Sequence, residues 1–190
     1  MPKSNNKRGT LYVISAPSGG GKGTIIQRLL ELRPDLHLSV SATTRVPRVG
    51  ENDGEAYFFI THDEFRQMID NDEFLEHAEY VGERYGTPKM PIYEAIDNGR
   101  DALLEIEVQG AKQVMGMDTG AVTIFIVPPS LDELERRLRG RGTDSEDKLI
   151  KRLERARLEL EERHDYDHVV VNDDVARAAE EILGIIDGGG

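Results

Sequence analysis

The sequence contains no cysteine, and this absence excludes several kinds of chemistry at once. Without thiols the chain forms no disulfide, no zinc–thiolate or iron–sulfur centre and no cysteine nucleophile. A chain without cysteine is compatible with the reducing cytosol, so we expect a cytoplasmic location.

Long apolar runs are absent as well. No run approaches the roughly 20 residues that a transmembrane helix needs. The segment 1–10 is polar and basic, and it lacks the apolar stretch of a secretory signal. We therefore expect neither a membrane span nor a secretory signal.

Basic residues are too few for a protein that coats nucleic acid. Lys and Arg total 24 against 36 Asp and Glu, which gives a formal net charge of −12 at pH 7. Nucleic-acid binding generally needs a basic face, so we expect no such partner. A phosphorylated small ligand remains compatible, because screening over about 8–10 Å makes local charge decisive.

What the sequence does contain is the balance of a globular domain, with 38% hydrophobic and 32% charged residues among 190. Apolar runs at 11–14, 102–108, 122–127 and 169–171 predict buried strands, with helical patterns between them. This alternation favours an α/β fold with a mainly parallel sheet. The segment 39–88 differs, because its β-type runs and turns predict a small α+β insertion that is mostly antiparallel.

Three helix starts carry a capping-box pattern, in which Ser or Thr precedes Glu by three residues. The pairs are Thr61 with Glu64, Ser130 with Glu133, and Thr143 with Glu146.

The strongest chemical signal is the glycine-rich segment 16–24, which lies between a predicted strand and a predicted helix. Its glycines let the backbone curl so that N–H groups point at phosphate, and the helix N-terminus adds partial positive charge. Lys22 would reach the β- and γ-phosphates of a nucleoside triphosphate. The strict phosphate-loop pattern has Gly where Ala16 stands and Ser or Thr where Gly23 stands, so the hydroxyl of Thr24 is the candidate Mg²⁺ contact.

Two arginines, Arg45 and Arg48, lie on either side of Pro47 in a turn-rich segment. Their guanidinium groups match phosphate oxygens in a bidentate way, and the hydroxyls of Tyr57 and Tyr85 could add donors. Most arginines in proteins are exposed, so this cluster by itself indicates an ordinary surface as readily as a phosphate site.

Seven short motifs follow one another within a stretch of resemblance that runs from about residue 11 to residue 186. They are Ser-Gly-Gly-Gly-Lys at 18–22, Ser-Ala-Thr-Thr-Arg-x-Pro-Arg at 41–48, Tyr-Gly-Thr-Pro at 85–88, Glu-Ile-Glu-Val-Gln-Gly at 105–110, Pro-Pro-Ser at 128–130, Arg-Gly-Arg-Gly-Thr at 139–143 and Val-Asn-Asp-Asp at 171–174. Together they resemble guanylate kinase, a family of nucleoside monophosphate kinases. The resemblance implies transfer of a phosphoryl group from ATP to GMP with Mg²⁺, giving ADP and GDP, in purine nucleotide metabolism.

The resemblance also implies a role for each matching residue. The residues implied to bind ATP are Ser18, Gly19, Gly20, Gly21, Lys22, Gly23, Thr24 and Asn172. Those implied to hold the GMP phosphate are Arg45, Arg48, Tyr57 and Tyr85. Those implied to lie at the guanine are Ser41, Glu76, Thr87 and Glu107. Those implied to act in the transfer are Lys22, Arg45, Arg137, Arg141 and Arg152.

Chemistry supports the implied role of Glu76. Guanine presents N1–H and N2–H₂ donors on one edge, and a single carboxylate accepts from both, whereas adenine has an acceptor at N1. Sites that hydrogen-bond one particular group reject analogues lacking it by about 10⁴–10⁵. Without the resemblance, an exposed strand carboxylate is the simpler interpretation.

Glu105 and Glu107 alternate along a predicted strand, so we expect both side chains on one face. The family usually has Asp where Glu107 stands, near the guanine and the metal. The extra methylene is expected to displace a metal-bound water, and a misplacement of about 1 Å can change a rate by about 10². Direct Mg²⁺ contact by Thr24 or Glu107 is therefore a candidate rather than an assignment.

Arg137 and Arg152 lie on two predicted helices, and Arg141 lies at the break between them. Arginines on a mobile flap deliver positive charge to the transferring phosphoryl group and exclude water on closure. A solvated helix face with i,i+4 ion pairs, such as Glu133 with Arg137, is the competing explanation.

We predict a three-layer α/β P-loop core with an acceptor-binding insertion and a helical lid. The core would comprise 1–38, 89–130 and 161–190, with a GMP-binding domain at 39–88 and a lid at 131–160. The expected partners are ATP and GMP, with dGMP a further candidate. The sequence is compatible with a monomer and with a homodimer.

Two other functions stay open. One is a related P-loop kinase with another acceptor, such as ribose 1,5-bisphosphate, against which Glu76 and Thr87 argue. The other is an inactive guanylate-kinase-like domain that binds phosphorylated proteins through the arginine cluster. Lys22 argues against that domain, whereas Gly23 and Glu107 keep it open.

Overall fold

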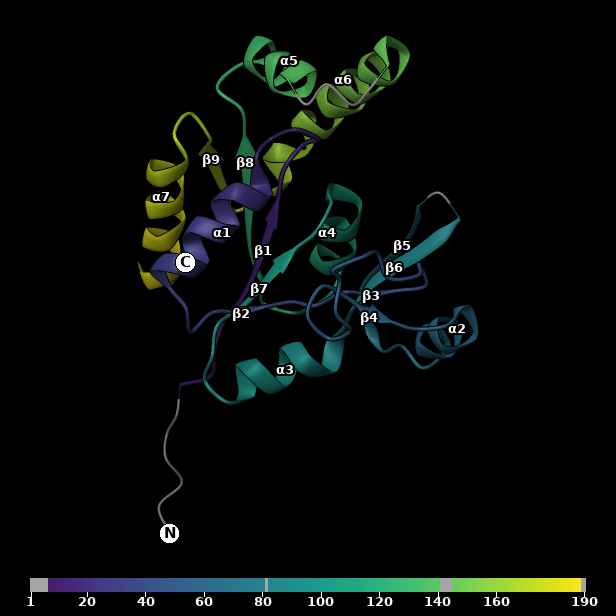
Figure 1. The fold of residues 1–190 in the computed structure, drawn as a ribbon. Helices are drawn as coiled ribbons and strands as arrows, with labels where there is room; N and C mark the ends of the chain where they lie inside the picture. The colour runs from purple at the N-terminus through teal and green to yellow at the C-terminus, as the bar shows by residue number, and fades with distance from the viewer. Residues whose placement is uncertain (1–6, 81, 141–144, 189–190) are drawn as a thin grey trace.

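The computed structural model describes residues 7–80, 82–140 and 145–188. The described chain forms a parallel sheet with helices on both faces, and a smaller sheet lies beside it (Figure 1). The α/β class predicted from the sequence is therefore confirmed. Within the described ranges, no helix combines the length and the apolar content needed to cross a bilayer.

The larger sheet has five strands in the described residues, in the order β2-β7-β1-β8-β9, and every neighbouring pair is parallel. The strands are β1 (Leu11–Ser15), β2 (His37–Leu38), β7 (Ala102–Glu105), β8 (Val122–Val127) and β9 (His168–Val171). Parallel strands are covered on both faces, which explains why they read as continuous apolar runs in the sequence.

Helices cover the two faces of this sheet (Figure 1). They are α1 (Lys22–Leu32), α3 (Lys89–Asp97), α4 (Val108–Met115) and α7 (Val175–Gly188). Tyr12 and Ile14 of β1 are buried in one apolar cluster with α1 and α7. Leu11 and Val13 point the other way and are buried with α3 and α4. Alternate side chains of β1 thus pack into two separate cores, one on each face of the sheet, and the result is a three-layer arrangement.

The smaller sheet has the order β4-β3-β6-β5. Its strands are β3 (Ala42–Thr43), β4 (Phe58–Phe59), β5 (Phe74–Tyr80) and β6 (Glu83–Pro88), and α2 (His62–Asp70) packs on it. The β3–β6 and β5–β6 pairs are antiparallel, whereas β3 and β4 are parallel. The prediction of a mostly antiparallel insertion is confirmed.

A helical pair extends from the main sheet at its upper end in Figure 1. It consists of α5 (Leu131–Gly140) and α6 (Glu146–Glu161), and a short 3₁₀ helix (Glu162–Asp165) follows. Leu134, Leu138, Leu149 and Ala156 form an apolar cluster of their own between the two helices.

The three predicted capping boxes have different outcomes. The box at Thr61 and Glu64 forms in both directions. At α5 the Glu133 N–H donates to Ser130 Oγ at 3.1 Å, but the Glu133 carboxylate accepts from arginines instead of returning the bond. Those hydrogen bonds lower the pKa of Glu133 to about 2. Thr143 lies outside the described residues, and the residue that precedes α6 is Ser145.

One strand prediction is wrong in a way that affects the site. Strand β7 ends at Glu105, and Glu107 is instead the residue that precedes α4, with φ −75° and ψ 161°. The carbonyl oxygen of Ile106 accepts hydrogen bonds from the side chains of Ser15 and Lys22, so the strand ladder ends there. Glu105 and Glu107 therefore do not share a strand face.

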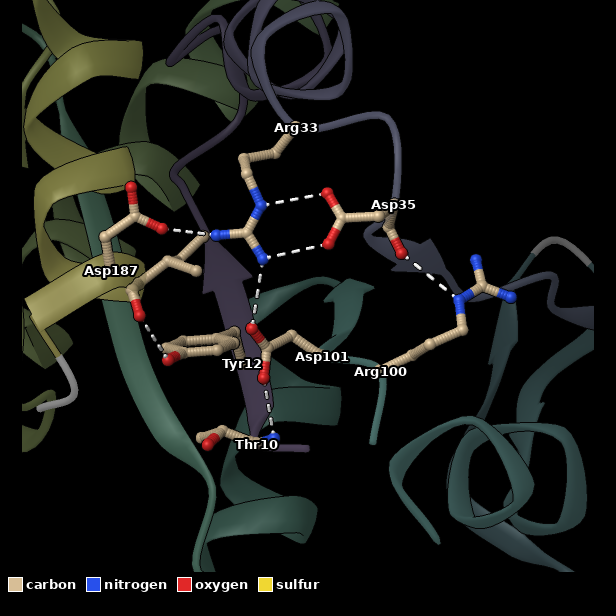
Figure 2. Close-up of polar contacts among 8 residues, drawn as sticks. Thr10, Tyr12, Arg33, Asp35, Arg100, Asp101 and Asp187 are labelled. Atoms are coloured by element: carbon tan, nitrogen blue, oxygen red, sulfur yellow. Dashed lines mark hydrogen bonds and ion pairs between the residues drawn. The ribbon is translucent and has the colours of Figure 1, made fainter. Parts of the chain in front are cut away.

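Arg33, just beyond α1, connects three parts of the chain that are distant in sequence (Figure 2). It forms ion pairs with Asp35 at 3.0 Å and with Asp101 at 3.2 Å, and it also pairs with Asp187 near the end of α7. The Tyr12 hydroxyl donates to a backbone carbonyl of α7 at 3.1 Å. These contacts fasten the last helix to the beginning of the central strand.

Candidate active site

A cleft of about 1320 Å³ lies between the parallel sheet, the smaller sheet and α6. Its position at the carboxyl ends of β1 and β7 is where open α/β sheets generally bind ligands. Several of the predicted site residues line it, namely Ser18, Lys22, Ser41, Tyr57, Glu76, Tyr85, Glu107 and Arg152. Residues from both sides of the proposed reaction therefore meet in one space.

The phosphate loop connects β1 to α1 and has the conformation that its glycines permit. Gly19 and Gly21 have φ of 88° and 84°, in the left-handed region that other residues rarely adopt. A Cβ on Gly21 would also come within 2.4 Å of the Asn172 side chain. These two positions therefore require glycine.

Lys22 is the first residue of α1 and its side chain is only 13% exposed. Its Nζ donates to the Ile106 carbonyl at 2.7 Å and lies 3.7 Å from Glu107 Oε1. The ammonium group is thus held at the cleft wall, next to the loop.

Asn172, predicted on the ATP side, braces the phosphate loop. Its side-chain nitrogen donates to the Gly20 carbonyl at 2.7 Å, and its backbone carbonyl accepts from Arg137 Nη2 at 2.9 Å. Arg137 also pairs with Glu133 at 2.8 Å, so the i,i+4 pair of the competing explanation exists alongside the contact with Asn172. Arg137 is thus connected to the loop through Asn172.

The other lid arginines and Thr24 have separate positions. Arg152 of α6 lines the cleft and donates to Ser18 Oγ at 3.1 and 3.2 Å. Arg141 lies outside the described residues. Thr24 is exposed on the first turn of α1 and is not part of the described cleft lining.

Glu76 on β5 is a buried carboxylate, 8% exposed, so the simpler interpretation as an exposed strand residue is wrong. Its Oε1 accepts from Thr87 Oγ1 at 2.6 Å, and Thr87 is fully buried on β6. Burial raises the pKa of Glu76 above that of an ordinary glutamate. A Cβ on Gly110 would come within 2.7 Å of Glu76 Oε2, so glycine there leaves room for the carboxylate.

The arginine cluster forms a compact polar group. Arg45 Nη2 donates to both carboxylate oxygens of Glu51, at 2.9 and 3.0 Å, and the Arg48 N–H donates to Glu51 Oε2 at 2.8 Å. The Arg45 guanidinium lies 5.5 Å from the ring centroid of Tyr57, which meets Tyr85 edge-on at 6.0 Å. At 14% exposure the Arg45 side chain is not an ordinary surface arginine, whereas Arg48 is exposed.

The acidic residues of the cleft fit a metal that arrives with a nucleotide. Within the described residues, no group of three or more His, Cys, Asp or Glu side chains is placed to hold a metal. Glu105 and Glu107 both line the cleft, and a Cβ on Gly23 would lie 3.7 Å from Glu105 Oε1. One or two carboxylates together with substrate phosphates are the usual ligands of Mg²⁺.

Sequence reasoning missed two carboxylates of the site. Glu51 holds Arg45, and Glu159 of α6 accepts from the Ser18 N–H of the phosphate loop at 3.0 Å. Glu51 lies three residues after Arg48, within one turn, and this spacing could have indicated the contact. Glu159 lies on the same helix face as Arg152, but nothing local in the sequence connects it to Ser18.

Comparison with known proteins gives a consistent result. The family model for guanylate kinase matches residues 8–188. The chain is 49% identical to a guanylate kinase of Synechocystis sp. over 97% of both chains, and 51% identical to one of Clostridioides difficile over 95% of this chain and 88% of the relative. A crystal structure of guanylate kinase from Anaplasma phagocytophilum matches with a TM-score of 0.76 and 37% identity, covering 96% of this chain and 86% of that one. Sequence and fold therefore agree along almost the whole chain.

Proposed function

Because the chain belongs to the guanylate kinase family and so transfers a phosphoryl group from ATP to GMP, giving ADP and GDP, we propose that the cleft is where this transfer takes place. The observation that carries the proposal is the presence of Lys22 and the buried Glu76 on the walls of one cleft. The same membership favours guanylate kinase activity over the two alternatives that the sequence left open.

On the donor side, the phosphate loop holds the triphosphate of ATP. The backbone N–H groups at the start of α1 and the Lys22 ammonium bind the β- and γ-phosphates. Asn172 supports the loop from behind through its bond to the Gly20 carbonyl. The residues proposed to form the ATP site are Ser18, Gly19, Gly20, Gly21, Lys22, Gly23, Thr24 and Asn172.

On the acceptor side, the smaller sheet and its loops bind both ends of GMP, the phosphate and the guanine. Arg45, Arg48, Tyr57 and Tyr85 hold the phosphate, supported by the packing of Arg45 on the Tyr57 ring, which in turn contacts Tyr85. At the guanine the buried Glu76 accepts from the N1–H and N2–H₂ donors. Ser41 lines the same cleft as Glu76, and Thr87 fixes the carboxylate through its hydroxyl.

The transfer requires the γ-phosphate of ATP and the phosphate of GMP to be brought together. A phosphate oxygen of GMP attacks the γ-phosphorus of ATP, a new P–O bond forms, and the bond to the β–γ bridging oxygen breaks to release ADP. The transition state spreads charge over three equatorial oxygens, so catalysis consists mainly of positioning and cationic stabilisation. Lys22, Arg45, Arg137, Arg141 and Arg152 are the residues proposed to supply that positive charge.

Mg²⁺ is the cofactor that this family implies, and it neutralises charge on the transferring phosphates when it is bound. Glu107, with Glu105 beside it at the cleft wall, is the better-placed candidate to hold the ion or its water ligands. Thr24 is the second candidate, since its hydroxyl follows the position where phosphate loops usually carry Ser or Thr.

We assign two domains that move, because each has an apolar cluster of its own. The GMP-binding domain spans 39–88, which contains the whole smaller sheet, and the lid spans 131–160, which contains the whole α5–α6 apolar cluster. The segments 1–38, 89–130 and 161–190 form the core. Closure of both domains over the cleft would align the reacting groups and exclude water.

The acceptor is tested by measuring ADP release with ATP and Mg²⁺ in parallel reactions containing GMP, dGMP, AMP, UMP, CMP or ribose 1,5-bisphosphate. We expect turnover with GMP, slower turnover with dGMP, and none with the other four acceptors. A parallel reaction with a chelator tests the need for Mg²⁺. Equal turnover with AMP would contradict the assignment of Glu76 to the guanine. Turnover that survives removal of Mg²⁺ by a chelator would contradict the cofactor assignment.

The raised pKa of Glu76 predicts that GMP affinity and stability respond to acid in opposite directions. Only the ionised carboxylate accepts from both guanine donors, so GMP binding weakens as pH falls through a pKa that burial places above the ordinary value. The same shift means that the folded state binds this proton more tightly than the unfolded state. The Glu76 contribution to stability therefore increases as pH falls through the same range.

The measurement compares wild type with Glu76→Gln, because the pair shares every other titrating group, including the phosphate of GMP. The Kd for GMP and the Tm of the free enzyme are followed between pH 8 and pH 4.5 in both proteins. For both Kd and Tm, the difference between wild type and Glu76→Gln should change with pH, because only wild type carries the titrating carboxyl group. Parallel curves would show that Glu76 does not titrate in this range or does not contact the base.

A further inference from the structure

Ser18 at the start of the phosphate loop is held by two residues of α6. Its backbone N–H donates to Glu159 Oε2 at 3.0 Å, and its hydroxyl accepts from Arg152 at 3.1 and 3.2 Å. Arg152 and Glu159 are seven residues apart, which is about two helical turns, so they lie on the same face of α6. One helix therefore contacts both polar groups of one loop residue.

Glu159 is a buried carboxylate that the proposed chemistry does not use. It is 8% exposed, and its second oxygen, Oε1, accepts from Arg155 Nε at 2.6 Å. A buried carboxylate is costly unless each oxygen is satisfied, and here one oxygen is satisfied by the loop itself. Loss of the loop contact would leave a buried acceptor unpaired, so the helix and the loop constrain each other.

The contact divides the N–H groups of the loop between two tasks. The Ser18 N–H is already occupied by Glu159, and the N–H groups at the start of α1 remain for phosphate. Gly19 and Gly21, which follow Ser18, have left-handed conformations, and glycine adopts these about as readily as right-handed or extended ones. Because glycine does not fix its own backbone, the direction of the later N–H groups depends on anchors at the ends of the loop.

We propose that Glu159 is a positioning residue for ATP: it fixes Ser18, and through Ser18 the phosphate loop, and it couples that loop to the helix that carries Arg152. The inference rests on the proposed function, in which this loop binds ATP. Among the described residues that line the cleft Glu159 does not appear, so its effect reaches ATP through the backbone of the loop.

Two substitutions separate the hydrogen bond from the charge. Glu159→Gln keeps the length of the side chain and an oxygen that can accept from Ser18, but it loses the charge. Its NH₂ group then faces Arg155, whose side chain is 52% exposed and can bond to water instead. Glu159→Asp keeps the charge but is one methylene shorter, which withdraws the acceptor from the loop. Glu154 is exposed on the same helix, so Glu154→Gln and Glu154→Asp are the matched controls.

We expect Glu159→Asp to raise the KM and the Kd for ATP about tenfold, in line with loss of a hydrogen bond to a charged group. Glu159→Gln should restore most of that affinity, and neither variant should change the Kd for GMP more than about twofold. Both control variants should behave as wild type. The readouts are steady-state kinetics, nucleotide binding by calorimetry, and Tm for each protein.

The opposite ranking, with the Asp variant near wild type and the Gln variant impaired, would show that charge matters and would overturn the proposal. Equal weakening of ATP and GMP binding, or a lower Tm with unchanged ATP affinity, would reduce Glu159 to a general structural role and overturn it too. The parent assignment is tested separately with Lys22→Ala. If that variant keeps wild-type ATP binding and turnover, the assignment of the loop itself fails, whatever Glu159 does.

Discussion

Replacing Lys22 with alanine is expected to lower kcat by about 10²–10³ or more, because a preorganised donor is then missing where charge develops in the transition state. The fold should survive. Nζ donates to a single carbonyl, at Ile106, and its carboxylate neighbour Glu107 is 63% exposed, so solvent can take over that charge. The effect therefore falls on the chemistry rather than on stability.

The measurement is kcat and the KM values for ATP and GMP, together with Tm, for Lys22→Ala and for Lys112→Ala. Lys112 is half exposed on α4 and pairs with Glu162, so its removal controls for the loss of one positive charge. Turnover by Lys22→Ala at the rate of the control would remove Lys22 from the reaction. A collapse of Tm would instead mean that Lys22 stabilises the loop and that the kinetic result cannot be assigned to the transition state.

Replacing Glu76 with glutamine is expected to lower kcat/KM for GMP by about 10²–10³ and to narrow the discrimination against AMP by a similar factor. Glu76 Oε1 is already engaged by the Thr87 hydroxyl, and the amide that replaces the carboxylate would turn an NH₂ donor toward one of the guanine donors. Two donors facing each other leave both unpaired, and this is the costly arrangement in a buried site.

Stability should move little or rise in Glu76→Gln, because burial opposes the charged form that the substitution removes. Glu73→Gln, just before β5 and exposed, is the matched control. The assay compares kcat/KM for GMP and AMP in the three proteins. Undiminished preference for GMP in Glu76→Gln would place the guanine elsewhere in the cleft.

The structural features that were predicted correctly from the sequence are local ones. The strand, the glycine turn and the helix around Lys22 follow from apolar runs and from backbone freedom within about twenty residues. The full capping box at Thr61 is equally local. The motifs at 41–48 and 85–88 indicated the acceptor site because they resemble a family, whereas composition alone indicated only a globular acidic domain.

The features that were predicted wrongly or missed depend on side chains that compete for, or reach, a partner outside the local pattern. Glu107 left the predicted strand because the Ile106 carbonyl is taken by side chains of the first strand and of the phosphate loop. Glu133 gives up its capping bond to neighbouring arginines. The contact of Glu159 with Ser18 spans 141 positions, and no periodicity in a single helix encodes it.

The order of strands in the main sheet has a consequence for how the chain is made. Strand β1 leaves the ribosome first, but it lies in the centre of the sheet, and Leu11 pairs with Ala102. At about 5–20 residues per second, β1 waits roughly 5–18 s for its first neighbour β7, while the smaller sheet from β3 to β6 is already complete. Asp187, which pairs with Arg33 in Figure 2, is synthesised after the other two partners of that arginine. The acceptor-binding part can therefore fold during synthesis, whereas the β1 and α1 side chains that pack on α7 stay uncovered until α7 emerges.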